Sequence, residues 1–251
     1  VYIAIHGSPG EDGKLQGYFD MLDIPYTTCD ALTSASSMNK GYTKAIVQTI
    51  DKLHVAKSVQ LFDHTSYNVE SIKATLKLPM FVKPNNGGSS IGMSKVTNQF
   101  DLKAAIDKAF KEDNQVLIEE FISGREFSVG VVKLDGKITV LPITEVETGK
   151  EFFDFEAKYT PGMAKETTPA NLSDETRKRV SEIVMAVYLV LNCRGVVRID
   201  FILSGTEEDF YFIEINTIPG QTATSFIPQQ VAAMGMNLND FYTKLVRETI
   251  G

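Results

Sequence analysis

Two apolar segments near the end of the chain, residues 196–203 and 210–215, constrain the fold more than any other feature. Both are rich in β-branched and aromatic residues and predict strands. The polar turn at 204–209 is too short for a crossover connection, so the two strands must be antiparallel neighbours. Because both strands are strongly apolar, the sheet that contains them is expected to cover a core or a cleft.

This strand pair also carries four polar side chains at matching positions. Residues two apart share one face of a strand, so Arg198 lies beside Asp200, and Glu214 beside Asn216. If Asp200 lies opposite Glu214 in an antiparallel ladder, Arg198 must lie opposite Asn216. The sequence therefore predicts that all four groups gather in one patch.

The predicted patch has the composition of a magnesium site. Opposed carboxylates repel each other unless a positive charge lies between them. Asp200, Glu214 and the amide oxygen of Asn216 are hard oxygen ligands of the kind that Mg²⁺ binds together with water and phosphate. The alternative interpretation is a solvated face of a hairpin, and the apolar character of both strands favours the metal.

A loop rich in glycine, serine and asparagine follows Lys83. Its spacing from Gly87 to Gly92 resembles a P-loop, but Met93 stands where that motif requires lysine. Residues 88–92 also match the nucleophile elbow of hydrolases, but extended sequence follows and all three histidines precede the loop. A phosphate-binding loop remains, because backbone N–H groups can surround an anion; the alternative is a generic flexible loop.

The rest of the chain predicts alternating strands and helices, hence a mixed α/β and α+β fold. Residues 1–5 and 24–28 are expected to be extended, with a helix at 15–21 between them. A further helix is expected from Ser37 through Leu53. The remaining expectations are strands at 80–83, 94–96 and 116–118, a helix at 99–111 with Phe100 in its apolar stripe, a hairpin of 126–132 with 137–143, and a helix from Ser173 to Leu191. The polar stretch at about 147–172 is expected to be a long loop, either functional or disordered.

Composition narrows the class of protein further. The net charge of −7 argues against a general nucleic-acid binder, although a few lysines can still neutralise a nucleotide locally. No apolar run approaches the roughly 18 residues needed to cross a bilayer, so no membrane partner is expected. Cys29 and Cys193 read as buried thiols, which fits a cytoplasmic location. Val1 lies within an apolar run and no methionine precedes it, so the sequence is expected to begin within a longer protein.

Taken in order, the motifs of this chain resemble those of the D-alanine–D-alanine ligase family of ATP-grasp enzymes over nearly its whole length. The resemblance implies two α+β lobes that enclose ATP, at 38–122 and 123–251, preceded by part of a small α/β domain at 1–37. It rests on His6-Gly…Gly10-Glu-Asp-Gly13, Met38-Asn-Lys40, Val82-Lys-Pro84…Gly88-Ser-Ser90, Glu119…Gly124-Arg-Glu126, Ala157-Lys-Tyr159, Arg198-Ile-Asp200 and Glu214-Ile-Asn216-Thr-Ile-Pro-Gly220…Ser225.

The resemblance also implies roles for individual residues. Lysines would contact the phosphates or the purine pocket, two glutamates and a short backbone segment would bind the ribose and adenine, and the strand-pair patch would bind two Mg²⁺, with Mn²⁺ as an alternative. These residues are Lys40, Lys83 and Lys158; Glu126 for the ribose; Glu119 with the backbone of Phe121 and Ile122 for adenine; and Asp200, Glu214 and Asn216 for the metals. Ser89, Ser90 and Ser225 match positions at the phosphate loop or at the carboxylate of the second substrate.

The implied reaction joins two D-alanine molecules at the expense of ATP, through D-alanyl phosphate, to make a peptidoglycan precursor. Arg198 and the Gly220 N–H would stabilise the oxyanion of the tetrahedral intermediate. Tyr159 lies on the loop that closes over the site in the family, and its presence favours the dipeptide over D-alanyl-D-lactate. His6 and Glu11 match positions near the first substrate, and a structural role is the alternative for His6.

Three functions therefore stay open at this point. They are a D-alanine–D-alanine ligase, a D-alanyl-D-lactate or other ATP-grasp ligase, and a nucleotide-binding fragment without activity. The last arises because the family glutamate that orients the first D-alanine would lie before Val1. By analogy with the family, a homodimer is expected.

Overall fold

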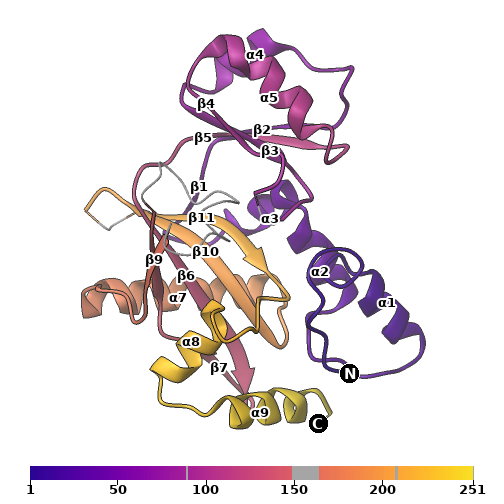
Figure 1. The fold of residues 1–251 in the computed structure, drawn as a ribbon, viewed down its shortest axis with the longest axis vertical. Helices are drawn as coiled ribbons and strands as arrows, with labels where there is room; N and C mark the ends of the chain where they lie inside the picture. The colour runs from indigo at the N-terminus through magenta and orange to yellow at the C-terminus, as the bar shows by residue number, and fades with distance from the viewer. Residues whose placement is uncertain (89, 149–163, 207–208, 251) are drawn as a thin grey trace.

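The fold contains two β-sheets with helices packed against them (Figure 1). The computed structural model describes residues 1–88, 90–148, 164–206 and 209–250. In Figure 1 the smaller sheet lies at the top, the larger sheet below it, and the N-terminal helices to one side. This arrangement is the mixed α/β fold that the sequence predicts.

The larger sheet has seven strands among the described residues. Its order is β1-β11-β10-β6-β8-β9, and β7 pairs with β6 outside this path. All pairings are antiparallel except that of β1 with β11, which is parallel. The strands are β1 (Leu53–Val55), β6 (Arg125–Leu134), β7 (Lys137–Val140), β8 (Thr144–Thr148), β9 (Ala164–Thr167), β10 (Val196–Ser204) and β11 (Asp209–Asn216).

One face of this sheet packs against α7 (Asp174–Val190). The side chain of Ser173 accepts a hydrogen bond from the Thr176 N–H and caps the helix, as the sequence predicts. Apolar residues of α7 and of the strands form the largest buried cluster among the described residues. Within it the Phe201 ring stacks on those of Phe127 and Phe210, with centroid separations of 5.4 and 4.4 Å.

The opposite face packs against α8 (Phe226–Ala233) and α9 (Leu238–Ile250). Strand alternation accounts for the two faces, because Val131 belongs to the cluster under α7 and Val132 to the cluster under α8 and α9. Gln230 of α8 is fully buried on this second face. It accepts a hydrogen bond from the Gly130 N–H (2.9 Å) and donates to the Ser128 carbonyl (3.0 Å), so α8 is tied to β6.

The smaller sheet has the strand order β2-β5-β3-β4 and is antiparallel throughout. Its strands are β2 (Ser58–Leu61), β3 (Met80–Pro84), β4 (Ser94–Val96) and β5 (Val116–Glu120). The helices α4 (Val69–Thr75) and α5 (Leu102–Ala109) contribute to its apolar core. The predicted strands at 80–83, 94–96 and 116–118 are thus confirmed.

Several expectations for the first half of the chain are wrong. Residues 1–52 contain α1 (Lys14–Met21), α2 (Ala31–Met38) and α3 (Lys40–Val47) but no strand. Residues 1–3 run beside 25–27, yet the Ile3 N–H donates to the Thr27 side chain rather than to a backbone carbonyl, so no ladder forms. The helix expected from Ser37 to Leu53 is also interrupted.

That interruption lies at Asn39, between α2 and α3. The residue has an extended backbone, and its side chain accepts from the Tyr42 N–H, so it caps α3. Helix α3 ends at Val47, and Leu53 begins β1 in the larger sheet. In the predicted helix at 99–111, the first turn is a 3-10 helix and Phe100 is 82% exposed, so it does not belong to the apolar stripe.

None of the helices in the described ranges is both long enough and apolar enough to cross a membrane. β1 belongs to the larger sheet although its residues fall within 38–122. The boundaries proposed at 37/38 and 122/123 stay predictions.

Replacing Gln230 with methionine tests how α8 supports β6. Methionine has a similar size but cannot satisfy the Gly130 N–H or the Ser128 carbonyl, which would be buried without partners. We expect the free energy of unfolding to fall by about 2 kcal/mol or more, measured by urea denaturation. Gln229→Met on the same helix is the matched control, because its partners Glu166 and the Thr224 carbonyl lie at the surface. Equal losses for the two variants would contradict this account.

Candidate active site at the junction of the two sheets

The predicted patch on β10 and β11 is present. Arg198 pairs with Asn216 and Asp200 with Glu214 across the antiparallel ladder, which is the predicted register. Arg198 and Asp200 point to the face opposite that of Ile199, which belongs to the core under α7. The patch therefore lies on the same face of the larger sheet as α8.

A β-bulge in β11 makes this arrangement compatible with a buried core. The register passes from Asp200–Glu214 to Phe201–Phe212, so Ile213 is skipped. Phe212 belongs to the core under α7, and strict alternation would direct Glu214 to that same buried face. The extra residue reverses the alternation, so Glu214 and Asn216 emerge on the face of Arg198 and Asp200.

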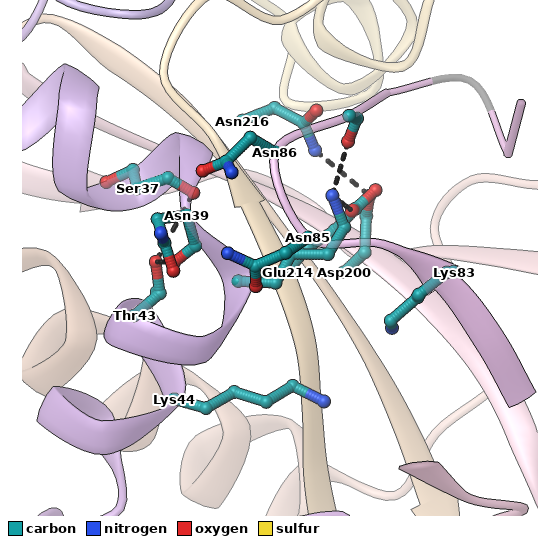
Figure 2. A network of polar contacts seen from close by, with 12 residues as sticks. Ser37, Asn39, Thr43, Lys44, Lys83, Asn85, Asn86, Asp200, Glu214 and Asn216 are labelled. Atoms are coloured by element: carbon teal, nitrogen blue, oxygen red, sulfur yellow. Dashed lines mark hydrogen bonds and ion pairs between the residues drawn. The ribbon is translucent and has the colours of Figure 1, made fainter. Parts of the chain in front are cut away.

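Asp200 accepts hydrogen bonds from several neighbouring side chains, among them Asn216 (Figure 2). It accepts two hydrogen bonds from Arg198, at 2.9 and 2.7 Å, and one from the Asn216 amide at 3.1 Å. The Ser128 hydroxyl on the neighbouring strand β6 donates a fourth at 2.6 Å. Burial alone would lower the pKa of Arg198, but Asp200 raises it above its ordinary value, so Arg198 stays cationic.

The N-terminus of α3 brings Lys40 to the second carboxylate of the patch. Lys40 Nζ lies 3.4 Å from Glu214 and also donates to the Gly87 carbonyl in the glycine-rich loop. The side chain of Lys40 is only 10% exposed, so its charge acts in a largely buried environment. Lys40 therefore links the patch on β11 to the loop that follows β3.

A buried group of charges lies beside this contact, on the smaller sheet. Lys44 Nζ of α3 donates to one carboxylate oxygen of Glu119, and Lys83 Nζ of β3 lies 2.6 Å from the other. Burial alone would raise the pKa of Glu119, but the two ammonium groups lower it from 4.5 to about 2. Burial lowers the pKa of Lys44 from 10.5 to about 8; Glu119 opposes this shift, while Lys83 and Lys40 add to it.

Amide side chains connect α3 with the smaller sheet. The side chain and the carbonyl of Asn85 accept from the N–H groups of Gly41 and Lys40, at 2.9 and 3.2 Å. Gln115 Oε1 accepts from the Asn85 and Gln60 amides, at 3.0 and 2.9 Å. The lysines of α3 thereby have a defined position relative to Lys83 and the loop.

The N-terminal turn contacts the loop after β11. His6 Nδ1 lies 2.7 Å from the Ile218 carbonyl, and Glu11 accepts from the N–H groups of Ile218 and Gly7. In the same loop, a Cβ at Gly220 would lie 2.6 Å from the Ser225 hydroxyl, so a larger residue there would require Ser225 to move. Both predicted substrate segments thus meet at one end of the patch.

The other predicted site residues that the structure describes lie on β6, directly after β5 and in the glycine-rich loop. Glu126 is on β6, the Phe121 N–H donates to the Pro79 carbonyl, Ile122 follows it, and Ser90 has a positive φ of 58° in the glycine-rich loop. The roles of these residues in the site stay predictions. Ser89, Lys158 and Tyr159, together with Phe153 and Phe155, lie outside the described residues.

The ligand set at the patch fits a hard divalent cation. Within the described parts of the chain, no cluster of three or more histidine, cysteine, aspartate or glutamate side chains is arranged for a metal. The patch instead offers two opposed carboxylates and an amide oxygen, the oxygen ligands that Mg²⁺ accepts when water and phosphate complete its shell. Lysines beside the patch can bind anionic oxygens, so the site as a whole suits a metal–phosphate ligand.

Comparison with known proteins identifies the family. The family profile described as D-ala D-ala ligase C-terminus matches residues 48–247. The D-alanine–D-alanine ligase of Parabacteroides distasonis is 44% identical over 250 residues, which cover 100% of this chain and 75% of that protein. The chain belongs to the D-alanine–D-alanine ligase family.

Solved structures of ATP-grasp ligases of this family share the fold. The VanG D-Ala:D-Ser ligase from Enterococcus faecalis superposes with a TM-score of 0.87 at 35% identity, covering 99% of this chain and 72% of that one. The D-alanine–D-alanine ligase from Bacillus anthracis gives a TM-score of 0.86 at 31% identity, with 99% and 79% covered. The predicted family and the ATP-grasp fold are confirmed.

Sequence reasoning missed three residues of this site. Lys44 lies four residues after Lys40 on a predicted helix, hence on the same face, and that spacing could have identified it. Ser128 contacts Asp200 only because β6 pairs with β10, and Gln115 acts across three segments of the smaller sheet. No local pattern signals those two long-range contacts.

The pKa of Glu119 predicts how stability depends on pH. Its folded pKa of about 2 is below the ordinary 4.5, so the ionised carboxylate stabilises the fold above pH 4.5, and this contribution is lost as pH falls toward 2. A shift of this size corresponds to on the order of 3 kcal/mol. We therefore expect Glu119→Gln to lower the free energy of unfolding strongly at pH 6 and much less at pH 3, in urea titrations.

Glu70→Gln serves as the control for that series. Glu70 pairs with Lys73 on α4 and is 78% exposed, so its loss should have little effect at either pH. A loss of stability in Glu119→Gln that is the same at both pH values would contradict the buried ion pairs.

Proposed function

We propose that this chain is an ATP-dependent ligase that joins two D-alanine molecules into D-alanyl-D-alanine, with ADP and phosphate as the other products. The observation that carries the proposal is the patch of Arg198, Asp200, Glu214 and Asn216, which faces Lys40 at the junction of the two sheets. Family membership supports the assignment of the reaction, and the peptide product is the precursor that the family supplies for peptidoglycan.

The positive charge of the lysines at the junction suits the binding of a nucleoside triphosphate. Lys40 donates to the Gly87 carbonyl in the glycine-rich loop and Lys83 directly precedes that loop, whose N–H groups can bind anionic oxygens. Asp200, Glu214 and Asn216 would hold the magnesium ions, which offset the negative charge of the phosphates when bound. The carboxylate of the first D-alanine receives the γ-phosphoryl group, which converts a poor electrophile into a reactive acyl phosphate.

Arg198 is suited to the second step, in which the amine of the other D-alanine attacks. Its guanidinium is fixed by two hydrogen bonds to Asp200, so it needs little reorganisation to stabilise an oxyanion. The Gly220 N–H lies on the loop directly after β11, and Ser225 is packed against that glycine. We assign His6 and Glu11, which bind the same loop, to the pocket of the first D-alanine. A homodimer and a cytoplasmic location stay predictions carried by the resemblance.

Phosphate release tests the ligase activity and the metal ligands together. The purified chain should release phosphate from ATP and Mg²⁺ only when D-alanine is added. Asp200→Asn and Glu214→Gln preserve side-chain size but remove a charged ligand, so turnover should fall at least about 100-fold. Asp209→Asn at the exposed start of β11 is the control and should keep full activity. Phosphate release that is independent of D-alanine, or an active Asp200→Asn variant, would refute the assignment.

The second substrate is tested by competition. The similarity to a D-Ala:D-Ser ligase makes D-serine a rival, and D-lactate is the other. With equal concentrations of D-alanine, D-serine and D-lactate at neutral pH, mass spectrometry of the products should show mainly D-alanyl-D-alanine. If the product with D-serine or with D-lactate exceeds D-alanyl-D-alanine, the chain would instead be one of the related ligases.

A further inference from the structure

Two lysines contact the single carboxylate of Glu119. Lys44 and Lys83 contact different oxygens of the carboxylate, and the three side chains are only 6%, 11% and 7% exposed for Lys44, Lys83 and Glu119. Buried charges are usually balanced one for one, because an unpaired buried charge is costly. The second lysine therefore calls for an explanation beyond the neutralisation of Glu119.

The two lysines differ in their position relative to the glycine-rich loop. Lys83 is the last residue but one of β3, directly before that loop. Lys44 lies one helical turn after Lys40 on α3, about 6 Å further along the axis from the end that contacts Gly87. Figure 2 shows Lys44 and Lys83 extending toward each other from α3 and β3. Both lysines contact Glu119, and Lys83 is the one that directly precedes the glycine-rich loop.

We propose that Lys44 is the permanent counter-ion of Glu119, so that Lys83 can leave this carboxylate for the phosphates of a bound nucleotide. This inference rests on the proposed function, because it assumes that ATP binds at the junction. Without Lys44, the departure of Lys83 would leave Glu119 as a buried carboxylate without a cation, which opposes binding. Lys44 is thus a positioning residue that acts on the nucleotide through Glu119 and Lys83.

A double-mutant cycle on ATP affinity tests this inference. Lys44→Met should weaken ATP binding at least about tenfold in calorimetric titrations, because Lys83 is then retained by Glu119. In the Glu119→Gln background the same Lys44→Met change should cost less than about twofold, because no carboxylate remains to retain Lys83. An equal loss in both backgrounds would mean that Lys44 contacts the nucleotide directly and would overturn the proposal.

The matched control is Lys103→Met. Lys103 pairs with Asp107 on α5 and its side chain is 67% exposed, so ATP affinity should not change. If the parent chain binds no ATP, the proposed function itself fails. If the parent binds ATP and Lys44→Met binds equally well, only the role of Lys44 is refuted.

A pH series gives a second readout, which starts from the parent chain. The charged groups that face Lys44 are Glu119 from β5, Lys83 from β3 and Lys40 from α3, and its pKa is lowered to about 8. Above that pH Lys44 loses its charge and no longer offsets Glu119, so the ATP affinity of the parent should fall between pH 7 and 9. The Lys44→Met/Glu119→Gln variant should show no such fall. A flat profile in the parent, or the same fall in both proteins, would overturn the proposal.

Discussion

The antiparallel pairing of β10 with β11 is the constraint on which the site depends. It places Asp200 opposite Glu214, and two carboxylates so arranged repel each other unless cations lie nearby. The protein meets this requirement with Arg198 on the same strand and Lys40 from α3. Each carboxylate thus has a cation beside it, and the same electrostatics suit a site that binds Mg²⁺ and phosphate.

The smaller sheet contributes to the site through its contacts with α3, and not by strand pairing with the larger sheet. Asn85 accepts from the first N–H groups of α3, and Gln115 binds the Asn85 amide, so the helix is attached to the smaller sheet. Helix α3 therefore carries Lys40 to the patch and Lys44 to Glu119 at the same time. Charges from both sheets are brought together by one short helix with an asparagine cap at its start.

The sequence predicted the features that depend on local pattern. Period-two alternation predicted that Arg198 shares a face with Asp200 and Glu214 with Asn216, the short turn predicted antiparallel pairing, and the capping serine predicted the start of α7. Predictions from the sequence were wrong where contacts between distant segments determine the local structure. Residues 1–5 look like a strand but have no ladder partner among the described residues, and Asn39 ends one helix and caps the next. The bulge at Ile213 could not be predicted from the sequence either. Strict alternation along β11 would direct Glu214 to the same buried face as Phe212.

The most direct test is a crystal structure of the chain with Mg²⁺ and a non-hydrolysable ATP analogue. The account predicts metal density between the carboxylates of Asp200 and Glu214, with the phosphates between the glycine-rich loop and this strand pair. It also predicts that Lys83 contacts phosphate while Lys44 remains on Glu119. Phosphates bound away from the β10–β11 patch, with both carboxylates still paired only to Arg198 and Lys40, would contradict it.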